Sequence, residues 1–392
     1  MDEDDKEFED GSRMTIMGHD DFSSYNSDGQ SKDLAQQEMD PSLWGYLTED
    51  IEDRILSWLP FEAFARMRTV CKRWNGILKS STFLHLYRSV PAPSHPCFLM
   101  FDAKDWSMCW LFNPSIHRWH SFPFDFQPIA SKFPCAAAGG LLCFCGVSSY
   151  PNLYVCNPIT RKWREIPPME NKRFPNLVGM VVDESSKSYK LIVAGDYHGE
   201  NTTSTEVFDS VNSSWVTTEG EIPLVHLTPR NSYYMGFIFW LTGDPFGLIA
   251  FNLEQAEWIT IQAPMPDNLI SPHLVGCTNR LLMVGGIKKH IAPKSIRIWE
   301  LDMRSMLWKT VAIMPPSLCS KFLKDSLTGD FMCIGQNNLI CLTSYKCSQA
   351  LMYDVLKKVW QWLPAYPFLS VVDIYRLHIG LPFTPRWDIG VF

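Results

Sequence analysis

An Asn or Asp stands six residues ahead of a Trp at six places in the sequence, each time within an apolar-rich stretch. This distance is constant, whereas successive Trp residues are separated by 44, 52, 43, 50 and 52 residues. Insertions are therefore confined to the segments between units, and a period of this length is typical of a repeated supersecondary unit. The six pairs are Asn113 and Trp119, Asn157 and Trp163, Asp209 and Trp215, Asn252 and Trp258, Asp302 and Trp308, and Asp354 and Trp360.

Each unit has the pattern of an antiparallel hairpin. In the second unit the apolar run 153–156 leads into a polar turn, 157–162, and then into a strand that carries Trp163. We expect the Asn or Asp side chain to accept a hydrogen bond from the backbone two residues on, which opens such a turn. Apolar stretches between the hairpins raise the count to about four strands a unit, which is one propeller blade. These stretches are 136–146, 189–196, 233–243, 280–286 and 331–342.

The pattern therefore predicts a mainly β fold, a six-bladed propeller preceded by a small module of three helices. Closing a ring of sheets buries faces and edges that a single four-stranded sheet leaves exposed. The first hairpin is preceded by only one short apolar stretch, 97–103, so the first blade lacks strands. The segment 371–383 follows the sixth Trp unit, and we expect it to complete that blade and close the ring.

The helical module is predicted between residues 43 and 88. Apolar residues recur there at helical spacing, and Pro60 separates the first helix from the second. Thr48 is the expected N-cap, with Glu49 and Asp50 at the positive end of the helix. A module of about 45 residues buries only a small core, so we expect apolar surface to remain for a partner.

Both regions resemble known families. Residues 43–88 resemble an F-box through an acidic pair, Ile-Leu, Leu-Pro and the string Arg68–Trp74, although Thr48 replaces the usual proline. The repeats resemble divergent kelch repeats: only 139–140 and 285–286 keep the double glycine, and only Asp354 follows a Tyr. From residue 43 to residue 383 the chain is thus similar to plant-type F-box/kelch-repeat proteins.

This resemblance implies a function. In that family the F-box docks the Skp-type adaptor of a cullin/RING ubiquitin ligase, and the propeller captures the protein to be ubiquitinated. The resemblance implies an adaptor and not an enzyme, with no catalytic residue, cofactor or metal. Side chains such as Ile55 and Trp74 have internal packing as their alternative role. Carried over by position, the implied adaptor-binding residues are Leu47, Ile51, Ile55, Leu56, Leu59, Pro60, Val70, Cys71 and Trp74.

The propeller loops supply candidates for substrate binding. In a four-stranded blade the loop between the second and third strands and the loop to the next blade lie on one face. Here those loops are long and combine cationic with aromatic residues. Clustered cations favour an acidic or phosphorylated segment, and a solvated face without a ligand is the alternative. The candidates are Lys172, Arg173, Tyr197, Arg230, Tyr233, Lys288 and Lys289.

Charge separates the N-terminal region from the rest. Residues 1–40 carry 13 acidic and 3 basic residues, and the remaining chain has 29 acidic and 32 basic ones. We expect 1–40 to be disordered, either as a solvating leader or as a partner-binding tail. The predicted organisation is an acidic tail at 1–40, an F-box at 43–88, a propeller at 97–383 and a C-terminal tail at 384–392.

Other classes of function find little support. The sequence has no phosphate-binding glycine loop, no His-Glu-x-x-His and no Gly-x-Ser-x-Gly, and its 12 cysteines form no Cys-x-x-Cys. Its basic residues are scattered, which disfavours nucleic-acid binding. An acidic start and no apolar run near 18 residues predict no secretory signal, no membrane helix and a nuclear or cytoplasmic protein. Two alternatives remain: a scaffold or ligand sensor that binds the adaptor without degrading anything, and a copper-oxidase-like kelch enzyme.

Overall fold

The computed structural model describes residues 47–392 apart from 91–95, 103–104, 125, 127–131, 147, 149–150, 198–199, 219–221, 223–226, 244, 290–291, 325–329, 345–346 and 367–377. The predicted acidic tail, 1–40, therefore lies outside the described residues, as does the first part of the predicted closing segment. The helices and strands below all belong to one compact unit, 49–392.

Among the described residues, the N-terminal module holds four short α-helices and a 3-10 helix, where three helices were predicted. Pro60 is the N-cap of the second helix and separates it from the first. Caps start the later helices: the Ser80 hydroxyl accepts the Phe83 N–H at 3.2 Å, and the Cys71 thiol accepts the Trp74 N–H at 3.4 Å. The elements are α2 (Glu49–Ser57), α3 (Phe61–Met67), α4 (Lys72–Gly76), η1 (Ile77–Lys79) and α5 (Ser81–Ser89).

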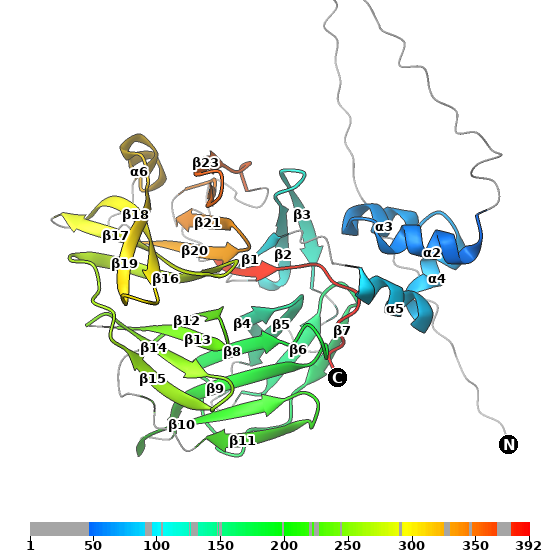
Figure 1. Cartoon of the computed structure of the whole chain (residues 1–392), viewed down its shortest axis with the longest axis horizontal. Helices are drawn as coiled ribbons and strands as arrows, with labels where there is room; N and C mark the ends of the chain where they lie inside the picture. The colour runs from blue at the N-terminus through cyan, green and yellow to red at the C-terminus, as the bar shows by residue number, and fades with distance from the viewer. Residues whose placement is uncertain are drawn as a thin grey trace, which may run out of the picture. The chain divides into compact units, whose positions relative to one another are not determined.

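Six four-stranded antiparallel sheets follow, which confirms the predicted six-bladed propeller (Figure 1). Blade one is β24 (His378–Phe383), β1 (Cys97–Asp102), β2 (Asp105–Asn113) and β3 (Arg118–Pro123); blade two is β4 (Lys132–Ala138), β5 (Leu141–Gly146), β6 (Leu153–Asn157) and β7 (Lys162–Glu165). Blade three is β8 (Leu177–Val182), β9 (Tyr189–Tyr197), β10 (Glu200–Asp209) and β11 (Ser214–Thr218); blade four is β12 (Leu227–Tyr234), β13 (Phe237–Thr242), β14 (Gly247–Asn252) and β15 (Glu257–Ile261). Blade five is β16 (Leu269–Cys277), β17 (Arg280–Lys289), β18 (Ala292–Asp302) and β19 (Leu307–Ile313). Helix α6 (Pro316–Phe322) leads to blade six, β20 (Phe331–Gln336), β21 (Leu339–Ser344), β22 (Leu351–Asp354) and β23 (Val359–Trp362).

The ring closes through the C-terminal strand β24. This strand pairs antiparallel with β1, from Cys97 opposite Phe383 to Asp102 opposite His378. Contacts between the inner strands run β24, β4, β8, β12, β16, β20 and back to β24. The expectation that the two ends of the chain share blade one is therefore confirmed, with one strand supplied by the C-terminus.

The repeated Asn or Asp forms the predicted turn in all six hairpins. Its side-chain oxygen accepts the N–H two residues on, at 2.8 to 3.0 Å. Two residues before each Trp the backbone φ lies between 52° and 57°, a left-handed conformation that turns the chain back into the outer strand. These residues are His117, Arg161, Ser213, Ala256, Met306 and Lys358.

The repeated Trp joins neighbouring blades. Its backbone pairs with the residue just before the turn Asn or Asp, an aromatic in four blades, as with Phe208 opposite Trp215. The Trp215 indole N–H then donates to the Pro167 carbonyl of the preceding blade at 2.7 Å, and the Trp119 indole does the same to Pro364 at 3.0 Å. Trp163 faces Cys156 instead and is 41% exposed.

Because Trp215 is buried and Trp163 is partly exposed, we expect their loss to lower the stability of the protein by different amounts. We expect Trp215→Ala to lower the free energy of unfolding by about 3–5 kcal/mol, because the side chain is 7% exposed and packs on Phe208. Trp163→Ala should cost about 1 kcal/mol, as an average substitution does. Thermal and denaturant unfolding would measure both, and equal losses would contradict the assignment of Trp215 as an inter-blade anchor.

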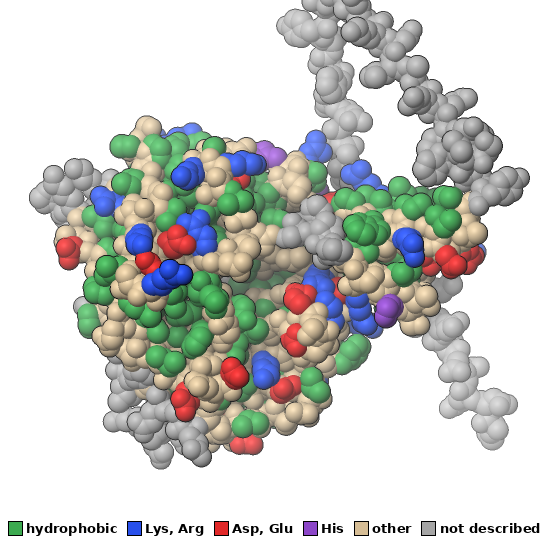
Figure 2. Space-filling model, viewed as in Figure 1, with side chains coloured by type: hydrophobic (Ala, Val, Ile, Leu, Met, Phe, Trp, Pro, Cys, Tyr) green, Lys and Arg blue, Asp and Glu red, His purple; other side chains and the backbone are tan. Residues whose placement is uncertain are grey.

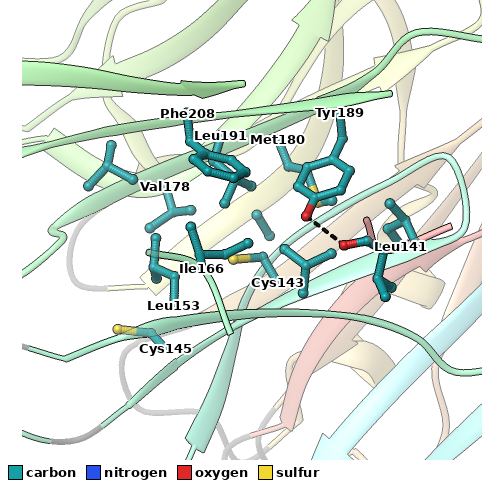
Figure 3. Close-up of a cluster of buried hydrophobic side chains, with 14 of the residues drawn as sticks. Leu141, Cys143, Cys145, Leu153, Ile166, Val178, Met180, Tyr189, Leu191 and Phe208 are labelled. Atoms are coloured by element: carbon teal, nitrogen blue, oxygen red, sulfur yellow. Dashed lines mark hydrogen bonds between the residues drawn. The ribbon is translucent and has the colours of Figure 1, made fainter. Parts of the chain in front are cut away.

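The core lies between adjacent blades and is built from alternating side chains of the inner strands. Figure 3 shows the cluster between blades two and three, where Leu141 and Cys143 of β5 face Tyr189 and Leu191 of β9. Burial raises the pKa of Cys97, Cys277 and Cys341 to about 12. These thiols stay protonated at neutral pH and pack as small hydrophobic side chains.

Candidate partner-binding surfaces

The first candidate surface is an apolar stripe on the helical module. Ile51 and Ile55 on α2 are 48% and 43% exposed, and Trp58 just after the helix is 61% exposed. Spacings of four and three residues place these side chains on one side of the helix. We call Ile51, Ile55 and Trp58 the α2 stripe. Figure 2 shows hydrophobic side chains gathered at the surface of this module, beside an acidic group.

The other implied adaptor-binding residues fall into two groups. Val70, which is 64% exposed, Pro60 and Cys71 lie at the surface near the start of α3 and of α4. Leu47, Leu59 and Trp74 are half-buried. Leu56 does not lie at the surface: its side chain is 3% exposed and packs with Phe64, Ile77 and Phe83.

Trp58 is a candidate that the sequence analysis missed. The helical pattern assigned the apolar positions of α2 to one face, namely 51, 55, 56 and 59. The structure divides them: Leu56 and Leu59 pack inward, whereas the α2 stripe points to solvent. The sequence does carry a signal for this residue: a large apolar side chain, Trp58, stands outside the helical pattern of core positions.

Charged groups hold the helix that carries the stripe. The Arg73 guanidinium of α4 donates to Glu52 at 2.8 Å and to Asp53 at 2.5 Å, both on α2. It also donates to the Glu49 carbonyl at 3.2 Å, and the Trp74 indole donates to Glu52 at 3.3 Å. Arg73 and Trp74 therefore hold α4 against α2, the helix that carries the α2 stripe.

The second candidate surface is the loop face of the propeller. Lys172 and Lys288 are exposed there, and Arg230 on β12 is half-buried. Tyr233 is exposed too, but it lies beside the turn between β12 and β13, at the opposite end of these strands, so the expectation that it shares the loop face is wrong. The side chains of Tyr197 and Lys289 lie outside the described residues.

Arg173 corrects the expectation of an exposed cation. Its guanidinium is fully buried and donates to the equally buried Glu206 carboxylate at 2.6 Å. Glu206 also accepts the backbone N–H groups of Glu170 and Asn171, at 3.0 and 2.8 Å. A buried charge requires such a partner. Arg173 therefore fixes the loop before β8, and its neighbours Lys172 and Phe174 remain exposed to solvent.

A cavity of about 640 Å³ opens among the inner strands of the propeller. Phe133 and Phe174 lie in its wall as a stacked pair with ring centroids 6.4 Å apart. Arg230 also lines it and reaches from β12 to the Cys333 carbonyl of β20, at 3.3 Å. Of the substrate candidates with described side chains, this cavity includes Arg230.

Two polar residues of the cavity wall were not anticipated from the sequence. The His273 Nε2–H donates to the Phe331 carbonyl at 2.8 Å, and Asp330 accepts from the Ser271 hydroxyl at 2.9 Å. Burial, with the nearby Arg230 cation, lowers the pKa of His273 to about 4, so this imidazole is neutral at pH 7. Among the described lining residues, the cavity wall therefore carries one negative charge, on Asp330, and one positive charge, on Arg230.

The described residues form neither a metal-binding cluster nor a membrane-spanning helix. Among the residues that the structure describes, no group of three or more His, Cys, Asp or Glu side chains is arranged to hold a metal ion. Within that part of the chain, none of the helices has the length and apolar character needed to span a membrane.

Comparison with known proteins matches both regions. Residues 44–86 match the F-box domain, and residues 111–348 match the KIB1-4 β-propeller. Relatives in Arabidopsis thaliana include Protein UNUSUAL FLORAL ORGANS, 28% identical over 85% of this chain and 81% of the relative, and F-box only protein 6, 28% identical over 83% and 70%. An F-box/kelch-repeat protein is 29% identical over 92% and 93%. The predicted resemblance is confirmed: the chain belongs to the KIB1-4 β-propeller family, and the F-box that it joins to this propeller makes it a substrate-recognition adaptor of a Skp/cullin/F-box ubiquitin ligase.

Proposed function

We propose that the α2 stripe is the surface through which this chain docks its Skp-type adaptor, and through that adaptor a cullin/RING core. The observation that carries the proposal is that three large apolar side chains face solvent although the module has its own core. Burying one such side chain contributes about 1.5–3 kcal/mol. Three together, with the exposed Val70 of the same module, supply the apolar centre that a stable interface needs.

The propeller, in this proposal, captures the protein to be ubiquitinated at its loop face and cavity. A volume of about 640 Å³ is within the range of ligand pockets. Phe174 and Phe133 offer an aromatic wall for an apolar side chain, and Arg230 offers a cation. Lys172 and Lys288 add exposed positive charge, which favours an acidic or phosphorylated segment.

The contribution of the chain to the reaction is positional. Tethering a substrate beside the transferring enzyme raises the effective concentration of its lysines. The bond-forming chemistry then belongs to partner proteins, and the chain acts inside the cell, in the nucleus or cytoplasm, where those partners work.

Proximity labelling under proteasome inhibition tests this function. The full chain fused to a labelling enzyme should mark its substrates, and their half-lives should lengthen in cells that carry Ile55→Asp in place of the natural chain. The same variant should still label those substrates, because the propeller is unchanged. Lys288→Glu should reverse the pattern, with weaker substrate labelling and normal adaptor binding. If the half-lives of the labelled proteins are the same with Ile55→Asp as with the natural chain, a role in degradation is contradicted.

A further inference from the structure

The last nine residues, 384–392, are packed into the structure and do not form a free tail. The Asn157 side-chain amide donates to the carbonyls of Arg386 and Ile389, at 3.0 and 2.9 Å. The Tyr189 hydroxyl donates to the Val391 carbonyl at 3.0 Å (Figure 3). Ile389 and Val391 are almost fully buried in the cluster between blades two and three. The segment is therefore anchored to the propeller through backbone and side chains.

An ion-pair network fixes the middle of this segment. Arg386 donates to both carboxylate oxygens of Asp388, at 2.9 and 2.7 Å, and also pairs with Glu184 in the β8–β9 hairpin. Lys187 of the same hairpin lies 3.5 Å from Asp388. Asp388 is 3% exposed. Because a buried carboxylate needs its partners, these pairs hold the residue between Arg386 and Asp388 in one position.

That residue is Trp387, and it packs against the helical module. Its ring stacks on Phe61 at a centroid distance of 5.4 Å and meets the edge of Phe64 at 5.9 Å. The Arg68 guanidinium lies 5.1 Å from its centroid. Trp387 thus joins the core cluster of Leu56, Phe64, Ile77 and Phe83. Arg88 of α5 adds a hydrogen bond to the Asp388 carbonyl at 3.3 Å.

We propose that residues 384–392 are a strap that fixes the helical module on the propeller. The module alone has four buried side chains in its core, too few for a small domain to be stable without further support. Trp387 supplies one more large side chain from a segment whose other end is buried in blades two and three. The strap thereby positions the α2 stripe relative to the propeller cavity, and Trp387 is a positioning residue.

The strap has a consequence for ubiquitin transfer, and this consequence rests on the proposed function. The proposal that residues 384–392 fix the helical module on the propeller does not. If the α2 stripe docks the adaptor and the propeller holds the substrate, the strap determines how far the substrate lies from the transferring enzyme. Effective concentration falls when the connection between two binding sites becomes longer and more flexible. A loosened strap should then slow ubiquitin transfer while both binding steps remain intact.

Distance measurement between two spin labels in the full-length chain tests the strap. Labels are attached through unnatural amino acids at Thr82 on α5 and at Val211 in the β10–β11 turn, both exposed, so that the natural cysteines are left alone. The natural chain should give one narrow distance distribution. Trp387→Ala should broaden it towards both shorter and longer distances, and Trp387→Phe, which keeps a ring on Phe61, should broaden it less.

Two further variants keep the test decisive. Phe61→Ala removes the stacking partner of Trp387 and leaves the four buried core residues in place, so it gives the answer if Trp387→Ala unfolds the helices. Phe392→Ala, at an exposed end of the same segment, is the matched control and should leave the distribution narrow. Unchanged distributions in both Trp387→Ala and Phe61→Ala would overturn the strap. Because no ligase is present, this result is independent of whether the α2 stripe binds the adaptor.

Discussion

The double substitution Ile55→Asp and Trp58→Ala is expected to abolish adaptor binding. It places a charge at the centre of the α2 stripe and removes its largest side chain, both exposed in the free chain. Truncating a hot-spot residue at the centre of an interface costs about 2 kcal/mol or more, and an unpaired buried charge adds to this loss. We expect the affinity to fall by at least about 100-fold, since about 1.4 kcal/mol corresponds to a factor of ten. Calorimetry or surface binding with a purified Skp-type adaptor measures this.

The fold should survive, because neither side chain belongs to the buried cluster of the module. His85→Asp is the matched control: it puts the same charge on an exposed position of α5, and adaptor binding should be unchanged. Substitution of Leu59 is a weaker test, because Leu59 packs against the module core and its loss would disturb the helices as well as the interface. If the doubly substituted chain binds the adaptor with an affinity within a few-fold of that of the natural chain, the α2 stripe is not the docking surface.

Local rules made the propeller predictable from sequence. The turn that starts at Asn113 depends on an Asn side chain and the N–H two residues on, so it is encoded within a few neighbouring residues. Repetition of that turn with a Trp six residues later gave the number of blades. Closure by the segment that contains β24 followed because blade one lacked a strand and a sheet edge needs a partner.

The burial of single side chains was not predictable in this way. Arg173 looks like an exposed loop cation until Glu206, 33 residues on in the chain, is placed beside it. Leu56 and Trp58 are both apolar and close in sequence, yet only the packing of α2 against Phe64 and Phe83 decides which one is buried. The contact of Trp387 with Phe64 joins residues at opposite ends of the described chain, a pairing that helical or strand periodicity does not encode.

Removal of residues 378–392 is expected to abolish folding of the propeller to a soluble monomer. This truncation deletes β24 and exposes the paired edge of β1 along its whole length. It also uncovers Cys97, Leu99 and Phe101, which are fully buried and pack with Phe383. An unpaired apolar edge strand is a template for pairing with other chains, so we expect aggregated protein on size-exclusion chromatography.

Two controls separate closure of the ring from the strap. Removal of 384–392 alone keeps β24, so the ring should stay closed and the protein monomeric. The helical module then loses Trp387, and the cluster between blades two and three loses Ile389 and Val391. Gly380→Val keeps the full length but places a Cβ 2.0 Å from the Ile334 Cδ1 of β20. Overpacking of this kind costs about 1–3 kcal/mol and should lower the melting temperature without aggregation at room temperature. A soluble, cooperatively unfolding monomer after removal of 378–392 would mean that β24 does not close the ring, because β1 would then be stable as an unpaired inner edge.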